Sequence, residues 1–308
     1  MDFEIPLLDA NDDSAHYRLQ NEPGEIQREY ITGYDRSTSL RVLGRLADVV
    51  HGHSTPSDPT PCTLALFDFA ALGQKPSRRY RELQIELVFA AHGTQGRPGL
   101  RGGRGGGDQR TALSRYDPAV RGLAPSGHKS LLQTTYTSES KHGIEAYAEA
   151  GMDPVATAGA RYSYSLGNTV ERGDSMVVEG MPAFVQRSSG KPNAARFTLR
   201  ENGSQRSGVP RYLRVAVLLE RRMGDEGLFL ATVNVRAHVS VFADAGEKVR
   251  RIMGSVPLDD AVCFDPTVAP TTDKYPVDDL ASVVLDDECS IQSGRESADG
   301  DGEKDEGG

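Results

Sequence analysis

The 308-residue sequence has no tryptophan, only three cysteines and no long apolar run. Cys62, Cys263 and Cys289 are isolated from one another, which excludes a disulfide framework and a zinc site built on cysteine pairs. No segment approaches the roughly 20 apolar residues of a membrane-spanning helix, and residues 1–9 lack the basic and apolar regions of a secretory signal. We therefore expect a soluble intracellular protein, cytoplasmic or nuclear, with no membrane contact.

The formal net charge of −9 is distributed unevenly along the chain. Residues 254–308 contain 15 acidic and 3 basic residues, whereas residues 1–253 contain 29 acidic and 32 basic residues. Acidic sequence rich in glycine and serine cannot offset its ordering entropy, so we predict a disordered acidic tail over 254–308. The near-neutral remainder gives no electrostatic argument for a nucleic-acid partner.

The rest of the chain divides into an extended lead-in over 1–37 and a strand-rich domain over 38–253. Within the domain, residues 93–110 are so rich in glycine and arginine that we predict a flexible loop. Residues 62–71 are apolar at every position but Thr63 and Asp68, as in a central strand buried on both faces. Residues 52–61 contain three prolines and predict a loop.

A two-residue alternation of apolar and polar side chains marks the clearest strands. It runs through residues 80–90, 196–201, 211–220 and 229–242. In the last of these, Val233 and Val235 fall on the apolar face, and Arg236 and His238 on the polar face. The glycine-containing turn at 223–227 predicts that the last two strands form a hairpin.

This strand content predicts an all-β fold with two antiparallel sheets packed as a sandwich. A partly closed β-barrel is the alternative. Short helices would make the fold α+β, and residues 142–150 fit either a short helix or a strand. A loose echo relates residues 62–90 to 211–242, each a strand, a basic turn and a second strand, and we interpret both as hairpins.

Two patterns resemble those of uncharacterised strand-rich proteins from filamentous fungi. One is Arg200-Glu201-Asn202 followed by residues 207–219 (SGVPRYLRVAVLL), and the other is Arg78-Arg79 before an alternating strand. The resemblance implies a fungal source. It brings no established activity and transfers no catalytic residue.

Two acidic residues are candidates for catalysis. Asp68 lies between Phe67 and Phe69 in an apolar strand, where burial raises the pKa of an unpaired carboxyl group. The alternative, which we favour, is a structural ion pair with an arginine such as Arg79. Glu201, at the end of another predicted strand, is the second candidate acid.

The sequence carries no motif for a cofactor, a metal ion or a catalytic nucleophile. His51 and His53 have no third ligand at a suitable spacing, so we expect solvated loop histidines, no metal site and no cofactor. The arginines of the 93–110 loop resemble RNA-contacting Arg-Gly-Gly segments, but no aromatic residues are interleaved with them. Nucleic acid is therefore not the expected partner.

One further motif lies in the acidic tail. Val283, Val284 and Leu285 are followed at once by Asp286, Asp287 and Glu288. This order resembles SUMO-interacting motifs, which add a strand to the edge of a partner's sheet. The alternative is that the segment packs back on the domain as a last strand.

Because the sequence assembles no catalytic constellation, a non-catalytic binding or scaffolding module is the leading functional hypothesis. Its partner is unknown, and a protein bound through the tail is one possibility. An accessory enzyme of fungal metabolism with a carboxylate-containing pocket is the second hypothesis. An RNA-associated protein that uses the Arg/Gly loop is the third.

Overall fold

The computed structural model describes eight stretches of the chain. They are residues 2–5, 19–33, 40–74, 78–92, 116–146, 162–187, 190–241 and 259–293. The predicted Arg/Gly loop at 93–110 lies outside them, as do the two ends of the predicted tail, 254–258 and 294–308.

Strands account for most of the described structure, and two 3-10 helices, η3 (Leu280–Ser282) and η4 (Leu285–Glu288), lie near its C-terminal end. The strands are β1 (Asp2–Ile5), β2 (Tyr30–Thr32), β3 (Arg41–Thr55), β4 (Asp58–Leu72), β5 (Arg78–Ala91), β6 (Ala119–Ala124), β7 (Gly127–Ala146), β8 (Tyr162–Ala183), β9 (Ala194–Arg200), β10 (Tyr212–Glu220), β11 (Phe229–Val241), β12 (Val262–Phe264) and β13 (Ser290–Gln292).

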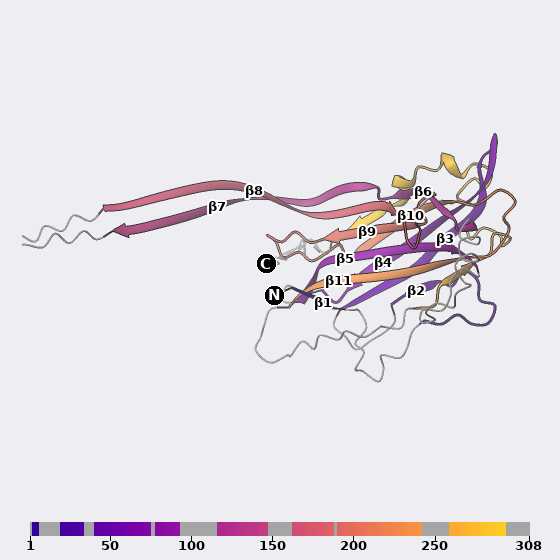
Figure 1. The fold of residues 1–308 in the computed structure, drawn as a ribbon, viewed down its shortest axis with the longest axis horizontal. Helices are drawn as coiled ribbons and strands as arrows, with labels where there is room; N and C mark the ends of the chain where they lie inside the picture. Colours follow the sequence, from indigo (N-terminus) through magenta and orange to yellow (C-terminus); the bar gives the residue numbers. More distant parts are fainter. Residues whose placement is uncertain are drawn as a thin grey trace, which may run out of the picture.

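The strands form two antiparallel sheets. Sheet A has the order β1-β11-β5-β9-β8-β7, with β12 also beside β11, and sheet B has the order β13-β10-β4-β3-β2, with β6 also beside β10. The sheets pack on each other as a sandwich, and β7 and β8 extend from one end of it (Figure 1). The predicted all-β, two-sheet sandwich is confirmed.

The main core lies between the two sheets and follows the alternation seen in the sequence. On β5, Leu83, Ile85, Leu87 and Phe89 are buried, and on β11 Val233 is buried while Arg236 is exposed. The inward residues of β4 and β10 meet them from sheet B. The predicted register of these strands is therefore confirmed.

Sheet B is buried on its outer face as well. Leu64, Leu66 and Leu218 point to that face and form a second core with Tyr275 and Leu280. This second core explains why residues 62–71 are apolar on both faces, since each face of β4 has its own cover. The cover on the outer side is the C-terminal segment, residues 271–289.

The prediction of a disordered tail is therefore wrong for residues 259–293. β12 pairs with β11 and β13 pairs with β10, and Gly52 lets the segment lie directly on β3. A Cβ atom at Gly52 would stand 2.0 Å from the carbonyl oxygen of Val277. Although the tail is acidic on average, it contains a few apolar residues. Their burial on the apolar outer face of sheet B is sufficient to order the segment.

Part of the predicted lead-in is also tied to the domain. β1 pairs with β11, and β2 pairs with β3. The side chain of Arg28 is buried and donates to Tyr30, Asn21 and Asp260. These contacts join residues 19–33 to Asp260, just before β12, so the extended lead-in is integrated wherever the structure describes it.

The predicted hairpin of β10 and β11 is wrong. β10 lies in sheet B against β4 and β6, whereas β11 lies in sheet A against β5, so the turn between them crosses from one sheet to the other. β4 and β5 are related in the same way. The echo in the sequence thus reflects two crossings between the sheets, which lie at opposite ends of the sandwich because β4 and β10 are antiparallel, as are β5 and β11. Alternation specifies a strand but not its neighbour.

Residues 52–61 do not form the predicted loop. β3 and β4 continue as a paired hairpin to Thr55 and Asp58. Pro59 and Pro61 are tolerated because the β10 ladder on the other side of β4 ends at Cys62. These prolines therefore lie where β4 has become an edge strand, and edge strands accept proline.

Candidate functional site

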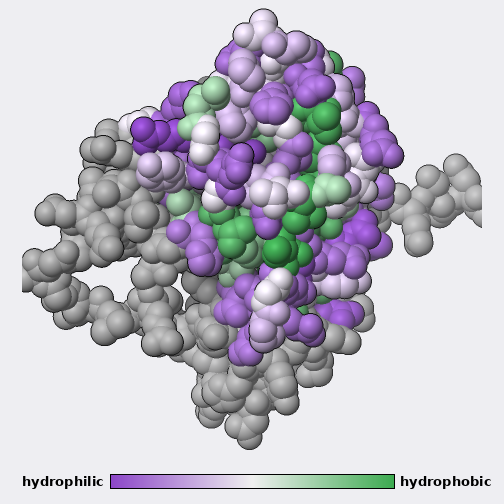
Figure 2. All heavy atoms as spheres, turned by 90° about the vertical axis from the view of Figure 1, so that its right-hand side faces the viewer, coloured by the Kyte–Doolittle hydropathy of each residue, from purple (hydrophilic) through white to green (hydrophobic). Residues whose placement is uncertain are grey.

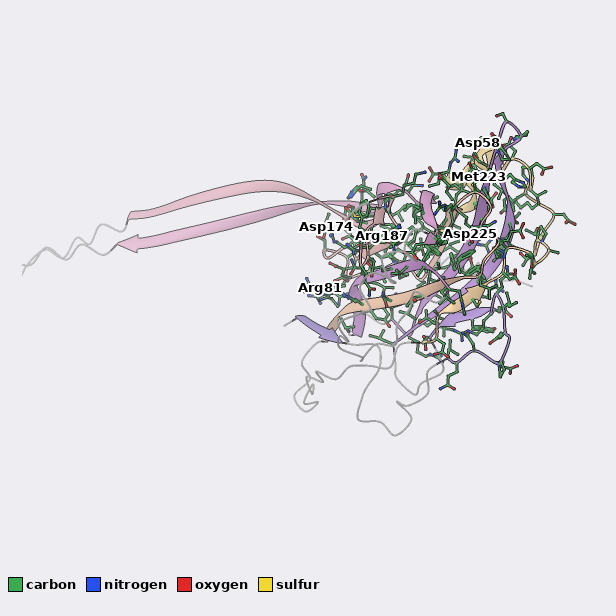
Figure 3. The ribbon with its side chains drawn as sticks, turned by 45° about the vertical axis from the view of Figure 1, so that its right-hand side comes forward. Asp58, Arg81, Asp174, Arg187, Met223 and Asp225 are labelled. Carbon is green, nitrogen blue, oxygen red and sulfur yellow. The ribbon has the colours of Figure 1, made fainter. Side chains whose placement is uncertain are left out.

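The feature that distinguishes this molecule is the pair of strands β7 and β8, which we call the ribbon. β8 pairs with β9 only from Val177 to Ala183, whereas β7 and β8 stay paired out to Ala146 and Tyr162. The ribbon therefore leaves the sandwich as two strands alone, as Figures 1 and 3 both show. Of the helix and the strand that the sequence allowed for residues 142–150, the structure shows a strand for residues 142–146. Residues 147–150 lie outside the described residues.

A buried amide holds the root of the ribbon. The side chain of Asn202 is fully buried, and its Nδ2 lies 2.7 Å from the carbonyl oxygen of Leu132, 2.7 Å from Oγ1 of Thr134 and 3.2 Å from the carbonyl oxygen of Asp174. The Asp174 carboxylate in turn accepts from the backbone and hydroxyl of Ser204. Asp174 lies where the ribbon leaves the sandwich (Figure 3). The 202–207 loop therefore fixes the ribbon to the body at both of its strands.

Glu201 positions this loop. Its buried carboxylate accepts from Nε and Nη2 of Arg79 at 2.6 and 3.1 Å, and Arg81 lies 3.4 Å away. It also accepts from the backbone of Gly208, which closes the 202–207 loop. The arrangement has the form of a structural ion pair, and such pairs are strongest when bidentate and buried. Residues 201–208 thus form the anchor of the ribbon.

The edges of the ribbon are unpaired in the described structure. β7 is the last strand of sheet A, and β8 has no second neighbour from Tyr162 to Met176. Neither edge has a proline over that length. Natural sheets usually protect such edges, because a row of free backbone donors and acceptors is a template for another strand.

Asp68 lies in an ion-pair network on the outer face of sheet B. Its two neighbours across the sheet are Arg45 and Arg214, in direct register on β3 and β10. Arg214 donates to both carboxylate oxygens at 2.7 and 3.0 Å, Arg45 donates at 3.0 Å, and the Tyr212 hydroxyl donates at 2.7 Å. Burial raises the pKa of Asp68, but these hydrogen bonds outweigh it and lower the pKa to about 2.

Asp68 therefore does form a structural ion pair, but with Arg214 and Arg45 and not with Arg79. Arg79 pairs with Glu201 instead. The structure does not bring the two candidate acids into one ion-pair network, since Asp68 lies with Arg45 and Arg214 and Glu201 with Arg79 and Arg81. A carboxyl group with a pKa of about 2 is ionised at neutral pH and unsuited to donating a proton there.

His51 is not the solvated loop residue that the sequence predicted. It is buried on β3, with Nε2 2.8 Å from Nε2 of Gln27 and Nδ1 2.9 Å from Oγ1 of Thr63. Burial and the positive charge of Arg221 lower the pKa of His51 to about 4, so the ring is neutral at pH 7. His53 is half exposed, 3.9 Å from Asp278. Among the described residues, no three histidine, cysteine or acidic side chains gather in a way that would hold a metal ion.

The motif at residues 283–288 is folded rather than free. Val283 and Leu285 pack against the second core, and η4 covers Leu285–Glu288. Asp286 pairs with Lys129, and Glu288 accepts from Lys274 and the hydroxyl of Tyr275. Val284 is exposed, and the backbone N–H of Asp287 donates to the carbonyl oxygen of Val284. In this structure the segment is therefore not free for strand addition. It packs on the domain, as the alternative predicted, but through a 3-10 helix and not as a last strand.

The end of the sandwich that faces away from the ribbon has a mixed surface. Hydrophobic residues gather near the middle of this face, with hydrophilic residues around them (Figure 2). Met223, which is 61% exposed, belongs to the β10–β11 connection at that end (Figure 3). Exposed apolar residues are normal on folded proteins, so this face indicates a binding site less specifically than the ribbon does.

Comparisons with known proteins give no family. No family model and no curated protein matches the chain. Among solved structures, the chain is similar to the NetB toxin of Clostridium perfringens in its membrane-inserted form, with 7% identity over 69% of this chain and 84% of that one. The TM-score is 0.25, which is too low to establish a shared fold. Within the described residues, no helix is long and apolar enough to cross a membrane.

Proposed function

We propose that this protein is a non-catalytic binding module that assembles with further copies of itself through the β7–β8 ribbon. The observation that carries the proposal is the pair of free edges on a ribbon that projects from the sandwich. A two-stranded ribbon by itself is marginally stable in water, and additional strands stabilise it.

The two free edges of one ribbon are suited to each other. β7 and β8 run in opposite directions. When two copies point their ribbons the same way, β7 of one copy therefore lies antiparallel to β8 of the next. Such a contact uses a different surface on each copy, and contacts of this kind produce rings or filaments.

The anchor at the root supports this role. Asn202 and Asp174 hold both strands at the point where they leave the body. A ribbon with a defined exit direction loses less conformational entropy when it joins a neighbour, and preorganisation of this kind raises affinity.

The candidate acids support a binding role over an enzymatic one. Asp68 and Glu201 each accept hydrogen bonds from arginine at both carboxylate oxygens. Carboxylates engaged in this way serve the fold, and neither supports the hypothesis of an acid poised for proton transfer.

The test is a chain with a shortened ribbon. Thr134 and Asp174 are register partners, so residues 135–173 can be replaced by Asn-Gly, a turn that suits antiparallel strands. Sedimentation velocity over a series of concentrations should show assembly of the full chain and a monomer for the shortened chain. A chain that lacks residues 294–308 is the control, and it should assemble like the full chain.

Two outcomes would overturn the proposal. One is a full chain that stays monomeric at every concentration tested. The other is a shortened chain that assembles as the full chain does. The buried residues Met176 and Val178 are retained in the shortened chain, so its sandwich should still fold. Thermal melting of each chain checks that it does.

A further inference from the structure

The loop that anchors the ribbon contains Asn202-Gly203, the only Asn-Gly pair in the sequence. In such a pair the backbone nitrogen of glycine can attack Cγ of the asparagine, because glycine has no Cβ atom to hinder the approach. The N–Cγ bond forms as the Cγ–Nδ2 bond breaks, and Nδ2 leaves as ammonia with the proton of the glycine N–H. Water then opens the cyclic imide to aspartate or isoaspartate. The sequence of the anchor is therefore chemically suited to spontaneous deamidation.

The fold holds both of the reacting groups in hydrogen bonds. Oδ1 of Asn202 accepts from the backbone N–H of Gln205 at 3.1 Å, in addition to the three contacts of Nδ2 with the ribbon. The backbone N–H of Gly203, which would supply the attacking nitrogen, donates to the carboxylate of Asp174. The Asn202 side chain is fully buried, although Gly203 itself is exposed. The reaction therefore requires the loop to open first.

Opening of this loop means release of the root of the ribbon. All three acceptors of the Asn202 amide belong to β7 and β8. The Asp174 carboxylate, which accepts from Gly203, also accepts from the backbone and the hydroxyl of Ser204. Because these bonds join the loop to the two strands, the Asn202 side chain can turn toward Gly203 only after the strands have left the loop.

The product of the reaction cannot restore the anchor. A carboxylate at position 202 would face the carbonyl oxygens of Leu132 and Asp174, which accept hydrogen bonds and donate none. It would also add a second negative charge to an anchor that already contains the Asp174 carboxylate. Burial of a charge without donors is costly, so the loop and the strands should stay apart after the reaction.

We propose that Asn202 is a deamidation site that the anchored ribbon protects, and that its conversion to an acid releases the root of the ribbon irreversibly. A released ribbon loses its defined exit direction, so a converted chain should assemble less readily. This effect on assembly rests on the proposed function of the ribbon. The chemistry at Asn202 does not, because it depends only on the contacts of the anchor within one chain.

Mass spectrometry of the tryptic peptide 201–206 measures the conversion of Asn202 during incubation of the folded chain. The wild type should react at least about tenfold more slowly than the same peptide made synthetically, because the loop must open first. Asp174→Ala removes the acceptor of the attacking N–H and should raise the rate severalfold. Asp225→Ala is the matched control, since Asp225 accepts from the backbone of Gly227 in a loop at the other end of the sandwich (Figure 3). It should react as the wild type does.

Hydrogen exchange measures the consequence of the conversion. In Asn202→Asp, amides of residues 131–134 and 174–177, which lie at the root of the ribbon, should exchange about tenfold faster than in the wild type. Thr134→Val keeps the amide but removes one of its acceptors, and it should speed both the exchange and the deamidation. Thermal melting checks that each variant is folded.

Three outcomes would overturn the inference: a folded wild type that reacts as fast as the peptide, equal rates in the two aspartate variants, or unchanged exchange in Asn202→Asp. Sedimentation reports assembly separately. A wild-type chain that stays monomeric while its Asn202 is protected contradicts self-assembly alone. An assembling chain whose Asn202 reacts as fast as the peptide contradicts the deamidation site alone.

Discussion

The sandwich and the ribbon are built from the same kind of strand, yet they bury their residues very differently. In the sandwich, β4 is covered on both faces and paired on both edges. Beyond its root, the ribbon has one paired edge on each strand, and no other described strand pairs with it there. The sandwich therefore obtains its stability from within the chain, whereas the ribbon has edges and faces left for contacts outside it.

A comparison of one substitution in both regions makes this difference measurable. Val233 is buried in the main core, and Val170 is a register partner of Ser138 in the ribbon. Val233→Asp places an unpaired charge in the core and should cost about 3–5 kcal/mol of unfolding free energy. Denaturant titration measures the loss, and recovery of soluble protein reports it when the loss is complete. His238→Asn, on the other face of β11, is the control and should be nearly silent.

The second core allows a smaller test of the sandwich. Leu280 is fully buried where the C-terminal segment covers sheet B. Leu280→Ala should cost about 2–3 kcal/mol, since it removes buried methyl groups and leaves a cavity. Val284→Ala is the matched control, because Val284 belongs to the same segment and is exposed. Equal melting temperatures for the two variants would contradict the packing of this segment.

The Asp68 network predicts a loss of stability that depends on pH. Asp68→Asn removes the charge that Arg214 and Arg45 share and should cost about 2 kcal/mol at pH 7. The pKa of Asp68 is lowered from near 4 in the unfolded chain to about 2 in the folded one. The stabilisation is therefore fully present above pH 4 and disappears as the pH falls through 2.

Urea titrations of both chains at pH 7 and at pH 2.5 test the pH dependence. The difference in unfolding free energy should shrink at the lower pH. A difference that stays constant, or an Asn variant more stable than the wild type, would contradict the structural role of Asp68.

The ribbon should tolerate what the sandwich does not. Val170→Asp should change the unfolding free energy of the dilute, monomeric chain by no more than about 0.5 kcal/mol, as is usual away from a core. Denaturant titration beside Val233→Asp measures both in one experiment. A cost in the ribbon as large as that in the core would show that residues outside the ribbon cover it in the monomer.

The local sequence pattern was sufficient to predict which residues of a sandwich strand face the core, where the strand has one buried face. The register of Leu83 to Phe89 and of Val233 followed from alternation, because side chains with a period of two separate core from solvent. The same pattern did not reveal that β10 and β11 lie in different sheets. Alternation describes one strand, and its partners are set by contacts far apart in the chain.

The same limit explains the missed features of the candidate site. The partner of Asp68 is Arg214, 146 residues away, and the cover of Leu64 and Leu66 comes from the segment taken for a disordered tail. The apolar residues on both faces of β4 were the signal that a second cover exists.

The most direct test of the account is hydrogen exchange of the wild-type chain at low and at high protein concentration. The proposal that copies assemble along the ribbon predicts that backbone amides of residues 135–146 become more protected as concentration rises. Amides of Leu64–Phe69, already buried within sheet B, should exchange equally slowly at both concentrations. Protection over 135–146 that is the same at every concentration would contradict the account.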